Sequence, residues 1–112
     1  MHELTVAGNI IAIVTSETRV AGAVRVSEVC LEIGRLAGIE YESLEFALTA
    51  LKPATVMSDA LIVIEKPGGK AGCRACGKTI FFDSFMGACD SCGSADLEIT
   101  GGNELRVKSI TI

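Results

Sequence analysis

Apolar residues follow a helical spacing in two segments of the chain. In the first segment they form one stripe, made of Leu4, Ala7, Ile10, Ile11 and Val14. This spacing predicts a helix over residues 4–17, because side chains three and four positions apart lie on the same face of an α-helix. The second stripe predicts a helix over residues 42–52, which must end before Pro53 because proline cannot continue the backbone hydrogen bonding.

Other segments have patterns typical of β-strands. Within residues 24–34, three apolar residues share one face: Val29, Leu31 and Ile33. Val24 and Val26 have the opposite parity, so the strand either begins after them or carries a bulge near Ser27. The run over residues 60–65 is almost entirely apolar, and it predicts a buried central strand.

Two further strands are predicted near the C-terminus. Residues 96–100 alternate in polarity, and residues 105–112 follow after a turn with two glycines. In the last strand the parity of the apolar residues divides them between two faces. We expect Leu105 and Val107 on one face, and Ile110 and Ile112 on the other.

The order helix, strand, helix, strand with short connections predicts an α+β fold. We expect a small mixed or antiparallel sheet with two helices on one face, and a cysteine-containing hairpin module inserted before the last strand. Pro67, Gly68 and Gly69 interrupt the pattern and mark a boundary. The predicted domains are therefore residues 1–68 together with 103–112, and residues 69–102.

Composition and charge narrow the function classes. The chain has 112 residues, of which 49% are hydrophobic, and a single tyrosine and no tryptophan, so its core must be mainly aliphatic. A net charge of −4 opposes binding to a phosphate backbone, and we expect no nucleic-acid partner. No apolar run has the length of a membrane span, and the first residues lack the basic region of a secretory signal. We therefore expect a cytoplasmic protein with no membrane contact.

Four cysteines form two Cys-x-x-Cys pairs, Cys73 with Cys76 and Cys89 with Cys92, separated by twelve residues. Two residues between paired cysteines let both thiolates of a tight turn bind one ion, and two such turns complete a tetrahedral site. Gly77 and Gly93 follow the pairs, where a residue without a Cβ lets backbone N–H groups turn toward the sulfurs. The spacing predicts a structural zinc site, because four thiolates leave no open coordination position.

Three other interpretations of these cysteines stay open. A pair of disulfides requires an oxidising compartment, which the expected location does not provide. A redox dithiol usually occurs once, at the start of a helix, rather than as a symmetric pair. Iron bound by four thiolates, as in rubredoxins, is the main alternative to zinc.

The remaining residues do not form a recognisable catalytic set. There is no glycine-rich phosphate loop. The only histidine is residue 2, so no histidine elsewhere in the chain is available for a Ser/His/Asp triad. Cys30, the fifth cysteine, is expected to be a buried or half-buried small apolar residue. A cysteine-dependent oxidoreductase that uses Cys30 is a separate hypothesis, and it predicts a reactive thiol in the zinc-loaded protein. We expect that the protein is not an enzyme.

The position of the histidine is unusual. His2 can offer a metal three nitrogens in one plane: the α-amine of Met1, the deprotonated amide of His2 and its imidazole. Such fused chelate rings suit Ni(II) or Cu(II). The alternative is a terminal histidine without a role.

Several short motifs, in the same order along nearly the whole chain, resemble the HypA/HybF family of nickel-incorporation accessory proteins for [NiFe]-hydrogenase maturation. They are Met1-His2-Glu3; Leu31-Glu32-Ile33-Gly34; Leu36-Ala37-Gly38-Ile39; Glu42-Ser43-Leu44-Glu45-Phe46-Ala47; two Cys-x-x-Cys-Gly turns; and Gly101-Gly102-Asn103-Glu104-Leu105. The resemblance implies a nickel metallochaperone that delivers Ni(II) to the hydrogenase large subunit.

The resemblance also implies roles for individual residues. His2 would be the indispensable ligand for transient nickel, with backbone nitrogens near it contributing and Glu3 tuning or orienting the site. Cys73, Cys76, Cys89 and Cys92 would hold structural zinc in a separate domain. The implied partners are the maturation GTPase of the same system, the [NiFe]-hydrogenase large subunit and, in some organisms, the urease accessory proteins. A monomer or a weak homodimer is expected.

Two departures from the family pattern limit what carries over. Some relatives have histidines beside the zinc cysteines, whereas this chain has Gly77 and Gly93, so a zinc site with exchanged histidine ligands is not expected. Arg35 stands where many relatives have an acidic residue, so a partner contact there would differ. The alternative function is a zinc-ribbon module that binds protein or nucleic acid without any nickel function.

Overall fold

The structure, a computed structural model, describes residues 2–83 and 87–112. Along the chain it contains α1 (Glu3–Val20), β1 (Glu28–Ile33), α2 (Tyr41–Leu51), β2 (Leu61–Glu65), β3 (Gly69–Cys73), β4 (Thr79–Phe82), β5 (Leu97–Gly101) and β6 (Leu105–Thr111). The molecule is elongated, with principal extents of 53 × 26 × 17 Å. Neither helix in the described part of the chain has the length and apolarity needed to cross a bilayer.

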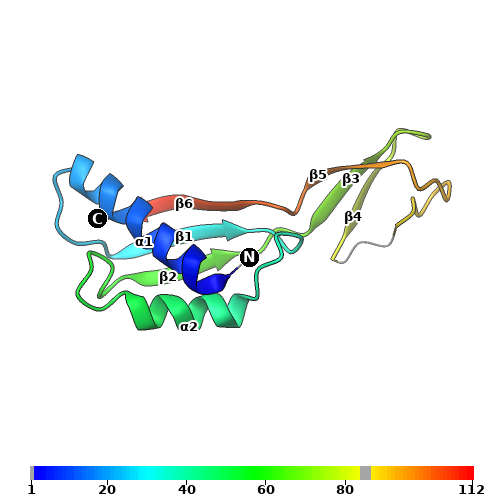
Figure 1. Cartoon of the computed structure of the whole chain (residues 1–112). Helices are drawn as coiled ribbons and strands as arrows, with labels where there is room; N and C mark the ends of the chain where they lie inside the picture. The colour runs from blue at the N-terminus through cyan, green and yellow to red at the C-terminus, as the bar shows by residue number, and fades with distance from the viewer. Residues whose placement is uncertain (1, 84–86) are drawn as a thin grey trace.

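The strands form two separate three-stranded sheets. The first has the order β2-β1-β6, with β1 parallel to β2 and antiparallel to β6. The second is antiparallel, with the order β4-β3-β5. Figure 1 shows α1 and α2 beside the first sheet at one end of the molecule, and the second sheet extending away from it. The predicted α+β class, with a mixed sheet and an inserted hairpin module, is confirmed.

The core of the first sheet lies between β1 and the two helices. Val29, Leu31 and Ile33 of β1 are fully buried, and they pack with the apolar stripes of α1 and α2 in one cluster. Because β1 begins at Glu28, the strand starts after the two valines of opposite parity. Of the two alternatives that the sequence left open, the first is therefore correct.

The prediction that residues 60–65 form a central strand is wrong. β2 lies at the edge of its sheet, and β1 is the central strand. Only alternate side chains of β2, those of Ile62 and Ile64, pack against the core, whereas Leu61 and Val63 are exposed. The reason is that β6, which is distant in sequence, occupies the other side of β1. An apolar run of this length cannot by itself distinguish an edge strand from a central one.

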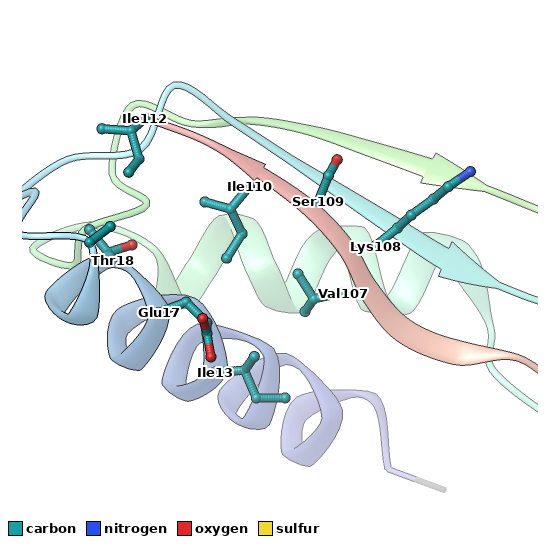
Figure 2. Close-up of a pocket in the computed structure, with 9 residues that line it drawn as sticks. Ile13, Glu17, Thr18, Val107, Lys108, Ser109, Ile110 and Ile112 are labelled. Carbon is teal, nitrogen blue, oxygen red and sulfur yellow. The ribbon is translucent and has the colours of Figure 1, made fainter.

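The predicted faces of the last strand also need a correction. The register with β1 shifts between Cys30, which pairs with Ser109, and Leu31, which pairs with Val107. Lys108 is the extra residue of this bulge, and it reverses the parity of the strand residues after it. Val107 and Ile110 therefore both pack against the core. Figure 2 shows these two side chains extending from β6 toward α1, and Lys108 pointing away from it.

An open groove separates α1 from β6. It has a volume of about 430 Å³, and Figure 2 shows apolar side chains from both elements along it. The residues drawn there include Ile13 and Glu17 of α1 and Ile110 and Ile112 at the end of the chain. The groove holds no pair of metal-ligating side chains among these residues, so the candidate chemistry lies elsewhere.

A loop after β1 joins the two sheets. Three of its backbone N–H groups donate hydrogen bonds to the segments that lead into and out of the second sheet. Gly34 donates to the Glu104 carbonyl at 2.8 Å, Arg35 to the Pro67 carbonyl at 2.9 Å and Leu36 to the Gly102 carbonyl at 2.6 Å. Both crossing segments are therefore tied to the same loop of the first sheet.

Candidate metal centres

The four paired cysteines converge at the far end of the second sheet. Their sulfur atoms all lie within 4.8 Å of one another. Across the two turns, Sγ of Cys73 is 3.6 Å from Sγ of Cys92, and Sγ of Cys76 is 3.8 Å from Sγ of Cys89. All four are free thiols without a disulfide. This is the arrangement that one tetrahedral ion with four sulfur ligands requires.

The two cysteine turns have the same backbone geometry. In the first, Cys73 donates its N–H to the Lys78 carbonyl at 2.9 Å, and Gly77 donates to the Cys73 carbonyl at 2.8 Å. In the second, Cys89 donates to the Ser94 carbonyl at 2.8 Å, and Gly93 donates to the Cys89 carbonyl at 2.9 Å. Both glycines have positive φ, 78° and 75°, which an L-residue with a side chain rarely adopts. Glycine therefore suits both positions because it adopts this left-handed backbone conformation without strain.

Backbone N–H groups, burial and neighbouring thiols shift the pKa values of Cys73, Cys89 and Cys92 in different directions. N–H groups of Cys92 and Ser91 point at Cys89 and lower its pKa to about 7. The pKa of Cys73 is also lowered, first by the N–H of Cys76. Cys92 receives an N–H from Ser94, but its contact with the Cys73 thiol and its burial together raise its pKa to about 11. Cysteines with a lowered pKa carry negative charge as thiolates, which attracts a metal cation. Binding of the cation then displaces the protons that remain on the other thiols.

Two ion pairs link the segments that carry the cysteines. Lys78, just after the first turn, lies 3.1 Å from a carboxylate oxygen of Asp90 in the second turn. Arg74 of the first turn lies 2.9 Å from a carboxylate oxygen of Asp96. Both pairs are exposed, so each contributes little to stability. Their positions nevertheless favour the approach of the two turns.

His2 lies in an exposed position at the start of α1. It is the N-cap residue of this helix, with an extended backbone, and its side chain makes no capping hydrogen bond. Its carbonyl accepts the N–H of Val6 at 3.0 Å, so the backbone of His2 is part of the first helical turn. The predicted α-amine ligand, that of Met1, lies outside the described residues.

Glu3 connects the start of α1 to the start of α2. Its Oε2 accepts the backbone N–H of Glu40 at 3.3 Å, and its side chain is half-buried. Sequence reasoning did not associate residue 40 with this site, since 37 positions separate the two glutamates. A helical pattern predicts which residues share a face, but not which residue of another helix lies beside them.

The two candidate centres are separate. The four cysteines are the only group of three or more potential metal-ligating side chains found within residues 2–83 and 87–112, and His2 is not among them. The structure therefore offers one closed sulfur site and one exposed terminal histidine.

Cys30 does not belong to either centre. Its thiol is half-buried and lies 3.6 Å from Oε2 of Glu65 on the neighbouring strand. Burial raises the pKa of this thiol, and the negative charge of Glu65 adds to the effect. A raised pKa reduces the thiolate fraction, which argues against the hypothesis that Cys30 is a reactive nucleophile.

Comparison with known proteins extends over the whole chain. All residues, 1–112, match the family described as hydrogenase/urease nickel incorporation, metallochaperone, hypA. The hydrogenase maturation factor HypA of Polaromonas naphthalenivorans is 41% identical over 112 residues, which cover 100% of this chain and 97% of the relative. The factor of the same name from Chlorobaculum tepidum is 38% identical over 112 residues, covering 100% and 99%.

Solved structures show the same fold. The solution structure of the Ni metallochaperone HypA from Helicobacter pylori superposes with a TM-score of 0.71 at 24% sequence identity, covering 100% of this chain and 97% of that one. A second solution structure of a HypA protein gives a TM-score of 0.74 at 24% identity, covering 100% and 96%. These two comparisons show that the arrangement of helices and sheets is shared.

Proposed function

The chain belongs to the HypA family of hydrogenase/urease nickel-incorporation metallochaperones, and on that premise we propose that nickel binds at its first three residues. Nickel incorporation during hydrogenase maturation is the function of this family. The observation that carries the proposed site is the exposed His2 at the N-cap of α1. We propose the imidazole and amide nitrogens of His2 and the α-amine of Met1 as ligands, with Glu3 contributing its backbone or orienting the site.

The chemistry of these donors suits a carrier. The donors are two neutral nitrogens and one deprotonated amide nitrogen, which form two fused chelate rings in one plane, and this arrangement suits Ni(II). An ion at the exposed end of a helix remains accessible from solvent, so an acceptor can replace the ligands one at a time. We therefore propose a transient nickel site that passes its ion on, rather than a store.

We propose structural zinc at Cys73, Cys76, Cys89 and Cys92. Support comes from the convergence of four sulfurs within 4.8 Å and from the absence of an open position once all four bind. Zinc bound there would hold together two turns whose own apolar contacts are few. Iron remains the alternative, and metal analysis of the purified protein distinguishes the two.

We further propose that the chain has two domains, each of which binds a different metal. Residues 1–68 and 103–112 would form the nickel-binding domain, and residues 69–102 the zinc-binding domain. The existence of two sheets, each with its own buried cluster, supports this division. The protein would act as a carrier rather than an enzyme, in the cytoplasm, with the maturation GTPase and the hydrogenase large subunit as partners.

A nickel titration tests the proposed site. Zinc-loaded protein with its native Met1 is compared with His2→Ala and with a version extended before Met1. One nickel should bind per native chain, binding should be lost in His2→Ala, and the extension should weaken or remodel it. Equal binding in all three would refute the site and favour the alternative of a zinc-ribbon interaction module.

A further inference from the structure

We propose that the free edge of β2 is an interface between two copies of this chain, in which the β2 strands pair antiparallel across a two-fold axis at Val63. The first sheets of the two copies would then form one continuous sheet. This surface contains none of the residues proposed above as nickel or zinc ligands, so the inference does not depend on either metal site.

The two edges of the first sheet differ in how they are protected. Edge strands commonly carry charged side chains or bulges, which hinder pairing with another chain. β6 has both, since it contains Arg106 and Lys108 and its register with β1 shifts at the bulge. β2 has the sequence Leu-Ile-Val-Ile-Glu, and its pairing with β1 contains no shift. It has the composition of a central strand, although no strand in the described part of the chain lies on its outer side.

Backbone groups on the outer edge of β2 can bond to a second copy of the same strand. Leu61 donates its N–H to the Ser27 carbonyl at 2.9 Å, so its backbone groups point toward β1. Because these groups alternate in direction along a strand, the N–H and C=O groups of Ile62 and Ile64 point away from β1. An antiparallel copy centred on Val63 places Ile62 opposite Ile64 of the second copy. Each such pair exchanges both of its backbone hydrogen bonds.

The side chains of β2 fit the same arrangement. Leu61 and Val63 alternate with the residues that pack against the helices, and they are 63% and 36% exposed on the open face of the sheet. Val63 would face its own counterpart, and such cross-strand pairs of apolar residues stabilise a sheet. Leu61 would lie opposite Glu65, whose carboxylate is already paired with Lys108 at 2.6 Å. The interface therefore removes apolar surface from water and leaves this ion pair in place.

The charges beside β2 are complementary under the same symmetry. A groove of about 270 Å³ lies between β2 and α2, which run side by side, and its charged lining residues are Glu45 and Lys52 (Figure 1). In one chain, Lys52 donates to the Ala60 carbonyl at 3.1 Å. A two-fold axis that reverses β2 also reverses α2, so Glu45 of one copy lies on the same side as Lys52 of the other. This opposite charge favours a second copy as the occupant of the edge.

Sedimentation equilibrium of the full zinc-loaded chain tests the interface. With increasing concentration, the mass should rise from that of one chain, 11.7 kDa, toward that of two. In Val63→Lys two lysines would face each other, so the dimer dissociation constant should rise about tenfold. Leu61→Lys is the matched control, because it adds the same charge to the same strand but opposite Glu65 of the second copy. Its dissociation constant should stay within about threefold of the native value.

Amide hydrogen exchange gives a second readout that needs no variant. The N–H groups of Ile62 and Ile64 should exchange slowly at about 1 mM protein and faster at about 10 μM, whereas that of Leu61, which is bonded within the chain, should not change. If Val63→Lys does not fold, this measurement decides alone. A native chain that stays monomeric at about 1 mM, or exchange of both amides that does not depend on concentration, would overturn the inference. Dimerisation that Thr111→Lys on β6 weakens and Val63→Lys does not would also overturn it, by placing the interface at the other edge.

Discussion

Gly34 and Gly102 are in direct contact where the two sheets meet. A Cβ atom on Gly34 would overlap the carbonyl group of Gly102 and would lie 2.6 Å from a carboxylate oxygen of Glu104. Gly102 itself has a φ of 99°, and a Cβ there would lie 2.7 Å from the Cα of Gly69. The segments crossing between the sheets can therefore reach the loop after β1 only because these positions lack side chains.

Gly34→Ala should push the loop after β1 away from the segment that contains Gly102, and so destabilise the protein. We expect the free energy of unfolding to fall by about 1–3 kcal/mol, the usual cost of forcing a group into a packed site, because the obstructing atoms belong to the backbone. Urea denaturation measures the change. Gly8→Ala is the control, since a Cβ there meets no atom within 4 Å and α1 should gain about 0.5–1 kcal/mol. Equal stability of the two variants would contradict the tight junction.

Zinc removal should unfold the second sheet but not the first. Within the described residues, the buried cluster of the second sheet consists of Ala71, Cys73, Ile80 and Cys89, so half of it is made of cysteines of the proposed metal site. Four-thiolate binding can contribute on the order of 10 kcal/mol, which so small a core cannot replace.

After chelation, NMR signals of residues 69–102 should collapse toward random-coil positions, whereas helical circular dichroism should persist. Zinc should restore the spectrum at one equivalent per chain. Cys30→Ser should bind as much zinc as the native protein, and Cys76→Ser should bind less. Persistence of the second sheet without metal would show that its core is sufficient.

Local patterns account for the parts of the fold and site that sequence could predict. The face formed by Val29, Leu31 and Ile33 follows from the two-residue period of a strand, and the convergence of the cysteines follows from the geometry of a two-residue spacing. Both signals are complete within a few residues. The two cysteine turns and the buried face of β1 are accordingly the best predicted features.

The missed features depend on pairs that are distant in sequence. The position of β2 at an edge is decided by β6, whose Thr111 pairs with Glu28. The bulge at Lys108 becomes visible only once that register is known. Contact between Glu3 and Glu40 likewise depends on how α1 packs beside α2. No periodicity within one segment contains this information.

Cys30 should react slowly with thiol reagents in the zinc-loaded protein. Burial and the adjacent Glu65 raise its pKa, so less thiolate is present at a given pH than for an unperturbed cysteine. The reaction rate, followed with a disulfide reagent between about pH 7 and pH 9, should therefore increase only toward the alkaline end.

Two substitutions at the neighbouring ion pair should shift this rate in opposite directions. Glu65→Gln removes a charge that raises the pKa of Cys30, so the thiol should react faster at the same pH. Lys108→Gln removes a cation that lowers this pKa, so the thiol should react more slowly. Cys30→Ser supplies the baseline. If the native protein reacted as fast as a free small thiol, this result would support the hypothesis that Cys30 is a functional nucleophile.

Nickel should leave the N-terminus on acidification while zinc is retained longer. The imidazole of His2 and a proton compete for the same lone pair, and a bound amide nitrogen must also lose its proton before it can bind nickel. Both requirements weaken nickel binding as the pH falls from about 7.5 to about 5. The zinc site has four anionic ligands that act together, so its loss requires several protonations.

Equilibrium dialysis followed by metal analysis measures both ions in the same sample, and His2→Ala reports any nickel bound elsewhere. Full nickel occupancy at about pH 5 would refute a site that depends on one histidine, whereas selective loss of nickel would fit a carrier that gives up its ion by stepwise exchange of exposed nitrogen ligands.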